Sequence, residues 1–137
     1  MNQKIQRISI KGIIYQEGKI FMLKDEGGKW ELPGGRIEFG EHIEDTFRRE
    51  FQEELGVTSV DVGQPINIWD FTVAVKGDDY HFVIAVFECH VNLRDVVLSD
   101  EHSQYRWMDP DKISDYPMRD GYIESIKKFM DFKDNNV

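Results

Sequence analysis

A chain of 137 residues, with 40% hydrophobic and 31% charged side chains, has the size and composition of one folded domain over residues 1–137, which excludes a disordered polypeptide. Its 26 acidic and 17 basic residues give a net charge of −9, which opposes sequence-independent binding to nucleic acid. No apolar run approaches the roughly 18 residues that cross a bilayer, and the start MNQKIQRISI lacks the apolar region of a signal peptide, so we expect a cytoplasmic protein without a membrane partner.

The first third of the chain is predicted to be mainly extended. Ile5–Tyr15 is rich in β-branched residues, and the turn sequence QEGK separates it from a second apolar run, KIFML. These two runs are predicted to form a β-hairpin. A short extended piece, WEL, then leads into PGG, whose proline and glycines break regular structure. The predicted order is therefore strand, glycine loop and helix.

A helix is predicted from about Glu41 to Leu55. Its apolar residues recur at every fourth position, which places them along one stripe of a helix. They are Ile43, Phe47, Phe51 and Leu55. Gly56 follows the last of them, and a glycine at this place is typical of a helix C-terminus.

The rest of the chain is predicted to hold more strands and a second helix. Residues that favour strands gather in the segments 59–62, 66–75, 80–91 and 105–108. The turn KGDD joins the second segment to the third, whose middle is so apolar that both of its faces should be covered. Apolar residues at helical spacing over 121–132 predict the second helix. This pattern indicates an α/β or α+β sandwich around a mixed β-sheet.

Three glutamates lie close together on the predicted first helix. At about 100° per residue, Glu50 and Glu54 are one turn apart on the same face, and Glu53 lies near Glu50. Like charges at these spacings repel, whereas a bound divalent cation would reverse the sign of the interaction. The alternative is a solvated acidic face neutralised by Arg48 and Arg49. Spacing alone does not decide between the two interpretations.

The segment around this helix resembles the Nudix box of the MutT-like Nudix hydrolases, G-x5-E-x7-R-E-U-x-E-E-x-G-U, where U is a bulky apolar residue. Every defined position of the box is filled in register, by Gly35, Glu41, Arg49, Glu50, Phe51, Glu53, Glu54, Gly56 and Val57. The preceding WELPGG also resembles the usual approach to this box. The resemblance implies a Nudix fold, an α/β/α sandwich, and it favours a metal site over a solvated acidic face.

The resemblance also implies an activity and roles for the residues of the box. Members of this family hydrolyse a pyrophosphate linkage in a nucleoside diphosphate joined to another group, with Mg2+ or Mn2+ as cofactor. By similarity, the predicted metal ligands are Glu50, Glu53, Glu54 and the backbone carbonyl of Gly34. Arg49 would orient a glutamate of the box through a charge-assisted pair, with Glu41 as the predicted partner.

A general base is required to position or deprotonate the attacking water. One candidate is Glu53. The other is Glu101 in the segment DEHSQYRW, because members of the family often place a glutamate in the loop before a late strand. The alternative for Glu101 is a solvated loop acid, and the role of Glu38 is left open.

Several other residues were weighed as site residues. Cys89 lies in an apolar run and is predicted to be a buried core thiol, and the four histidines lack the spacing of a zinc site. Aromatic residues could stack on a base and basic residues could meet phosphates, although aromatic residues on strands more often belong to the core. This pool comprises Trp69, Phe71, Tyr80, Arg7 and Lys24.

A nucleoside triphosphate is the expected substrate. Many members of the family that cleave ADP-ribose carry a proline at the position of Val73, and those that cleave dinucleoside polyphosphates often have a tyrosine nearby. Both marks are missing, which leaves sugar nucleotides as an alternative. A second function class is a sensor that binds ADP-ribose or a nucleotide without cleaving it; such a protein would be expected to lose metal ligands, and this box has lost none. Both a monomer and a homodimer are compatible with the resemblance.

Overall fold

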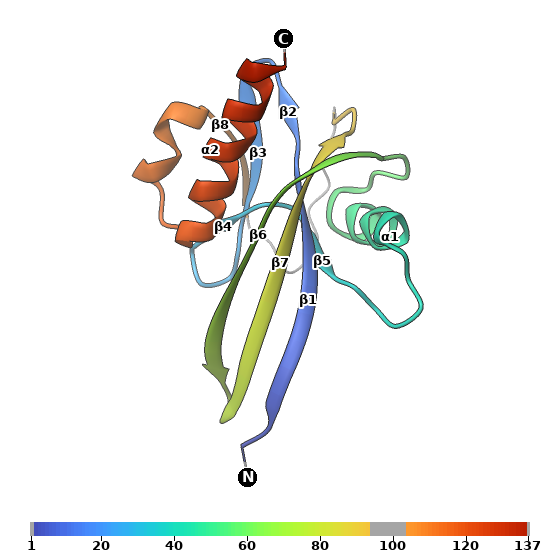
Figure 1. Cartoon of the computed structure of the whole chain (residues 1–137), viewed down its shortest axis with the longest axis vertical. Helices are drawn as coiled ribbons and strands as arrows, with labels where there is room; N and C mark the ends of the chain where they lie inside the picture. Colours follow the sequence, from blue (N-terminus) through green and yellow to red (C-terminus); the bar gives the residue numbers. More distant parts are fainter. Residues whose placement is uncertain (1, 94–103, 137) are drawn as a thin grey trace.

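The computed structural model describes residues 2–93 and 104–136 as a chain of short and long strands with two α-helices (Figure 1). In chain order the elements are β1 (Lys4–Ile13), β2 (Tyr15–Gln16), β3 (Lys19–Lys24), β4 (Trp30–Glu31), β5 (Gly34–Arg36), α1 (Ile43–Leu55), β6 (Asp61–Val75), β7 (Asp78–His90), β8 (Gln104–Met108), the 3-10 helix η1 (Pro110–Asp115) and α2 (Asp120–Asn135). No helix in these two described ranges is long and apolar enough to cross a membrane.

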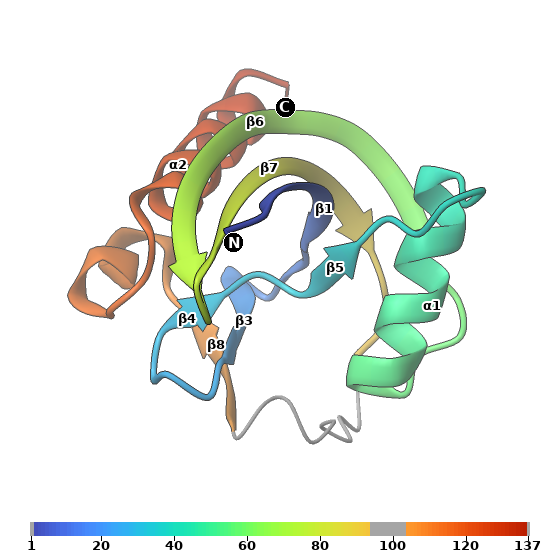
Figure 2. The same ribbon diagram turned by 90° about the horizontal axis from the view of Figure 1, so that it is seen from below.

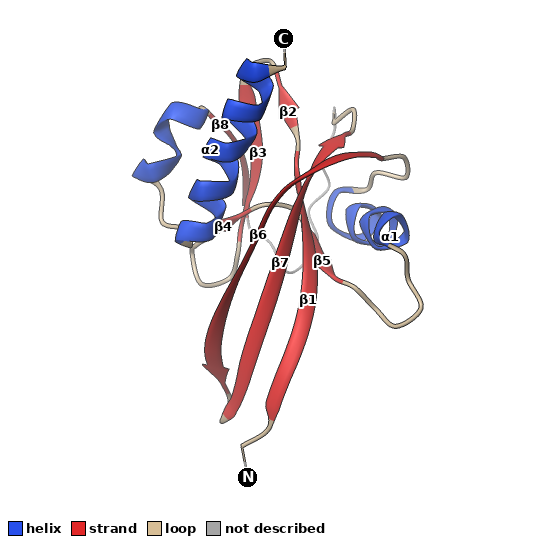
Figure 3. Cartoon of the chain, viewed as in Figure 1, coloured by secondary structure: helices blue, strands red, loops and turns tan. Residues whose placement is uncertain are grey.

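Two β-sheets lie between the helices. The larger sheet has the order β5-β1-β7-β6, in which β1 and β7 are parallel and the other pairs antiparallel. The smaller sheet has the order β2-β3-β4, and β8 pairs with β3. Figures 2 and 3 show α1 and α2 on opposite sides of the curved larger sheet. The predicted α/β/α sandwich around a mixed sheet is confirmed, with a second small sheet added.

The core is divided by β7, whose side chains point alternately to the two helices. Ile84 and Val86 belong to the cluster that also contains Ile126 and Phe129 of α2. Ala85 and Phe87 pack instead against the cluster built around α1, where Phe47, Phe51 and Leu55 are fully buried. The prediction that this strand is covered on both faces is therefore correct for its inner half.

The predicted first hairpin is correct only at its turn. Tyr15 pairs with Ile20 and Gln16 with Lys19, but β1 itself lies in the other sheet, between β5 and β7. The long first run thus divides between two sheets, which local periodicity could not indicate. A similar difference concerns β6, where the two predicted segments form one strand with register shifts around Pro65. This proline cannot donate to the ladder.

Helix α1 begins two residues later than predicted. His42 is its N-cap in an extended conformation, and its amide N–H donates to the Asp45 carboxylate at 3.1 Å. Gly56 ends the helix with φ of 71°, a left-handed conformation that glycine adopts without strain. Because Glu41 lies outside the helix, its side chain is free of the helical spacing and can turn back onto the helix surface.

Candidate active site

Glu54 is the innermost glutamate of α1. Its residue is only 3% exposed, and one carboxylate oxygen accepts a hydrogen bond of 3.0 Å from the amide N–H of Gly34 on β5. Gly34 has φ of 141°, and a Cβ there would meet the backbone of Ile10 and Lys11. Only glycine therefore lets β5 lie this close to β1 while its amide holds the Glu54 carboxylate.

Glu50 lies one helical turn before Glu54 on the same face of α1. A Cβ on Gly35 would lie 2.5 and 2.6 Å from the two carboxylate oxygens of Glu50, so the missing side chain makes room for this carboxylate. Burial raises the pKa of Glu50 above its ordinary value, although the hydrogen bond from Arg49 acts in the opposite direction. The two glycines of PGG thus position two different carboxylates: Gly34 binds Glu54 through its amide, and Gly35 leaves space for Glu50.

Arg49 connects the start of α1 to these carboxylates. Its Nε and Nη2 donate to the two carboxylate oxygens of Glu41 at 2.8 and 2.9 Å, and its Nη1 donates to Glu50 at 2.7 Å. Nη2 also donates to the carbonyl of Arg36 at 2.9 Å, which ties α1 to β5. The guanidinium is thereby fixed in one orientation.

Glu41 is held by more than the arginine. It also accepts hydrogen bonds from the amide N–H of Glu38 at 3.0 Å and from the hydroxyl of buried Thr46 at 2.9 Å. The hydrogen bonds from Arg49 are the main cause that lowers the pKa of Glu41 to about 2, and the same contacts raise the pKa of Arg49. The pair is therefore ionised throughout the physiological range.

Two further acids, Glu53 and Glu38, lie around the Arg49 guanidinium together with Glu50. The Glu53 side chain is 60% exposed and lies 3.7 Å from Arg49, and Glu38 is at the same distance from Arg49. Glu101, the second candidate base, and neighbouring His102 lie outside the described residues. Within the described ranges, no three Asp, Glu, His or Cys residues are placed closely enough to form a metal site.

Lys11 and Glu31 lie near these carboxylates, although the sequence analysis did not predict them as site residues. Lys11 on β1 is 7% exposed, and its ammonium lies 3.7 Å from the Glu31 carboxylate. Burial alone would lower the pKa of Lys11, but attraction to Glu31, Glu54 and Glu50 outweighs burial and raises it. A lysine inside the apolar run ISIKGII was the available signal.

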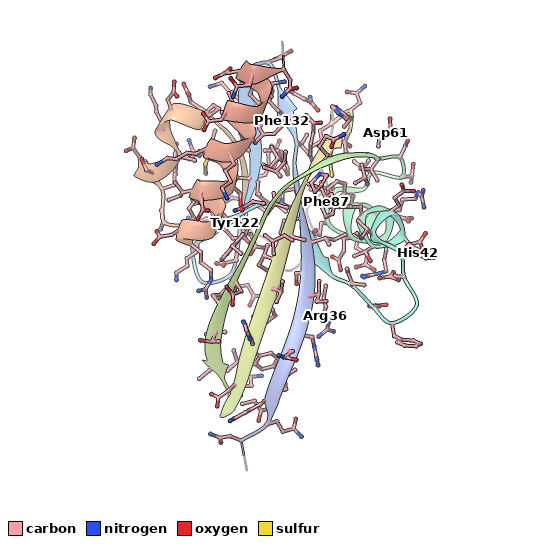
Figure 4. The ribbon with its side chains drawn as sticks, in the orientation of Figure 1. Arg36, His42, Asp61, Phe87, Tyr122 and Phe132 are labelled. Atoms are coloured by element: carbon pink, nitrogen blue, oxygen red, sulfur yellow. The ribbon has the colours of Figure 1, made fainter. Side chains whose placement is uncertain are left out.

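These residues line a cleft of about 690 Å3. It is bordered by residues from β1, β4, β5, β7, α1 and the loops before β4 and α1, and its lining includes Lys11, Asp25, Glu31, Arg36, Glu38, Glu50, Glu54 and Phe82. Figure 4 shows the side chain of Arg36 on β5 and that of Tyr122 on α2. Most of the side chains that line the cleft are charged, and Phe82 is the aromatic residue among them.

The three aromatic residues of the pool form a row with Phe82, which lies between Tyr80 and Phe71. Phe82 stacks with Tyr80 and with Phe71, and Phe71 stacks with Trp69, with ring centroids 5.3 to 5.6 Å apart. The guanidinium of Arg119 lies 3.8 Å from the Phe71 ring centroid. Lys24 lies over Trp30, and Arg7 donates to the carbonyl of Gln6. Of these residues only Phe82 borders the cleft itself.

Cys89 is buried as predicted.

The donor atoms of the cleft suit a hard divalent cation. Carboxylate and backbone oxygens are the ligands that Mg2+ and Mn2+ prefer. Glu50 and Glu54 supply two carboxylates whose positions are fixed by Gly35 and by the amide of Gly34, respectively. A third carboxylate could come from Glu53 after its side chain turns away from solvent.

Comparison with known proteins identifies the family of this chain. The family model described as NUDIX domain matches residues 6–129. The nucleoside triphosphatase NudI of Escherichia fergusonii is 30% identical over 127 residues, which cover 82% of this chain and 89% of that protein. The MutT protein of Methanosarcina mazei superposes with a TM-score of 0.79 at 26% identity, over 97% of this chain and 99% of that one.

A second solved structure supports the assignment. The MutT Nudix hydrolase of Burkholderia pseudomallei superposes with a TM-score of 0.75 at 25% identity, over 90% of this chain and 97% of that one. The helix that carries the carboxylates and the glycine loop before it agree with these matches. The chain therefore belongs to the Nudix family and is a pyrophosphohydrolase.

Proposed function

We propose that this chain hydrolyses a pyrophosphate bond of a nucleoside triphosphate with Mg2+ as cofactor and Mn2+ as a substitute. The observation that carries the proposal is the pair of fixed carboxylates, Glu50 and Glu54, which line a cleft large enough for a nucleotide. The NudI relatives, which are nucleoside triphosphatases by name, favour a triphosphate as substrate.

The cation would be held by Glu50 and Glu54, with Glu53 and the carbonyl of Gly34 as further ligands. A bound divalent cation neutralises charge on the diphosphate and makes a nearby water more acidic. Arg49 keeps the Glu50 carboxylate in place through its hydrogen bond of 2.7 Å, while Glu41 fixes the guanidinium from the other side. Arg49 and Glu41 are therefore positioning residues in this account.

Hydrolysis requires one water and one proton acceptor. The water oxygen forms a bond to phosphorus as the bridging P–O bond breaks, and the bridging oxygen leaves with the departing phosphate or pyrophosphate. The water gives its proton to a carboxylate, for which Glu53 and Glu101 are the two candidates. The exposed position of Glu53 leaves it able to turn toward the cleft.

The aromatic ring of Phe82 suits the nucleoside end of such a substrate. A base that contacts Phe82 would join the aromatic row in which Phe82 lies between Phe71 and Tyr80. The polyphosphate would then lie toward Glu50 and Glu54, since all three residues border the same cleft.

The proposal is tested by assaying nucleoside triphosphates, ADP-ribose and sugar nucleotides in parallel, each with Mg2+, with Mn2+ and with a chelator. We expect metal-dependent release of phosphate or pyrophosphate from at least one nucleoside triphosphate, faster than cleavage of the other classes. Tight nucleotide binding without any cleavage would instead identify a sensor. Preferred cleavage of ADP-ribose or a sugar nucleotide would overturn the substrate assignment while leaving the metal site intact.

A further inference from the structure

We propose that Lys11 is a built-in counter-cation of the active-site cleft, which keeps the affinity of the free protein for divalent cations low. The inference rests on the proposed metal site at Glu50 and Glu54. It concerns a different residue, which lies on β1 and outside the Nudix box.

The backbone fixes the position of Lys11. It pairs with Gly34 of β5 on one side and with Val86 of β7 on the other, so neighbouring strands hold it on both sides. Gly34 is also the residue whose amide holds Glu54. The Lys11 backbone and the Glu54 carboxylate are thus both placed by one residue of β5, Gly34.

The side chain of Lys11 is surrounded by acids. Its ammonium lies 3.7 Å from Glu31, and both Glu54 and Glu50 are close enough to act on its charge. Because these acids favour the protonated form, the lysine remains charged despite its burial. Glu50 is also paired with Arg49 at 2.7 Å, so the acids around the two cations keep an excess of negative charge that attracts a divalent cation.

A fixed positive charge in this place opposes the entry of a divalent cation. Like charges a few ångströms apart in a partly buried site repel strongly, and salt screens the repulsion only in part. The free protein should therefore bind metal weakly. The negative charge of a bound polyphosphate would offset Lys11, so that metal and nucleotide enter the cleft together rather than separately.

The test is a titration of the free protein with Mn2+, in which the electron paramagnetic resonance signal of the unbound ion is measured at each step. We expect Lys11→Met to bind Mn2+ at least about tenfold more tightly than the wild type, and Lys11→Arg to bind it as the wild type does. Lys4→Met is the matched control, because Lys4 lies on the same strand but is exposed and far along it from Lys11. Its affinity for Mn2+ should not change.

The double variant Lys11→Met/Glu31→Gln keeps the test valid if Lys11→Met alone folds poorly. It removes both members of the ion pair and is compared with Glu31→Gln alone: the double variant should bind Mn2+ at least about tenfold more tightly, and equal affinities would overturn the proposal. If a folded Lys11→Met variant binds Mn2+ with wild-type affinity, the role of Lys11 is overturned. The same holds if Lys11→Arg binds Mn2+ more tightly than the wild type. Glu54→Gln distinguishes the two proposals: if it leaves Mn2+ binding unchanged, the metal site itself is wrong.

Discussion

Replacing Gly35 by alanine should displace the Glu50 carboxylate and lower the activity, while the stability of the fold stays nearly unchanged. The added Cβ would lie 2.5 and 2.6 Å from the two carboxylate oxygens of Glu50, whereas ordinary contact begins at 3.4 Å. The carboxylate must therefore move by roughly 1 Å, which is enough to lower kcat/KM by about a hundredfold. The displaced atoms are the end of a flexible side chain, so the free energy of unfolding should change by less than about 1 kcal/mol.

Two other glycines supply the comparison. In Gly34→Ala the Cβ meets the backbone of Ile10 and Lys11, and φ is 141°, so we expect a loss of at least about 2 kcal/mol in the free energy of unfolding. In Gly27→Ala the nearest atom is at 3.4 Å, and stability should be close to that of the wild type. Urea unfolding and phosphate release from a nucleoside triphosphate measure the two effects. Wild-type kcat/KM in Gly35→Ala would refute the reasoning, as would a loss of stability equal to that of Gly34→Ala.

Three further predictions concern Arg49, Glu41 and Cys89. Arg49→Lys keeps the charge but loses the two parallel hydrogen bonds to Glu41, so hydrolysis should slow by about tenfold or more; an unchanged rate would show that the charge suffices. Because the pKa of Glu41 in the fold, about 2, lies below its ordinary 4.5, its ionised form stabilises the fold above pH 4.5, and this contribution is lost as the pH falls toward 2. The melting temperatures of the wild type and Glu41→Gln should therefore converge across this window, and a constant difference would contradict the assignment. Burial raises the pKa of the Cys89 thiol, so a thiol reagent should label it only after unfolding; rapid labelling of the folded protein would be inconsistent with its position.

The sequence was sufficient to locate the carboxylate helix and the loop that precedes it. Helical spacing and Gly56 are local signals, and both survive in the structure because α1 packs its apolar stripe on the larger sheet. The different environments of Glu53 and Glu54 could also have been read from the spacing. At about 100° per residue, Glu54 lies on the side of Glu50 that faces the apolar stripe, and Glu53 lies on the opposite side.

The parts that could not be predicted depend on contacts between distant segments. Lys11 meets Glu31 because β1 leaves the first hairpin and enters the larger sheet beside β5 and β7, a choice that periodicity does not encode. The same pairing brings the backbone of Gly34 against Ile10. The role of Glu101 stays a prediction, since it lies outside the described residues.

The most direct test of Glu50 and Glu54 as the metal-binding carboxylates is the rate of nucleoside triphosphate hydrolysis by Glu54→Gln across a range of Mg2+ concentrations. Glutamine retains an oxygen that can accept from the amide of Gly34, so the fold should persist while the charge that binds the cation is lost. We predict a rate at least about a hundredfold below the wild type at every Mg2+ concentration. A variant that folds and hydrolyses the same substrate at the wild-type rate, with the same dependence on Mg2+, would contradict the assignment.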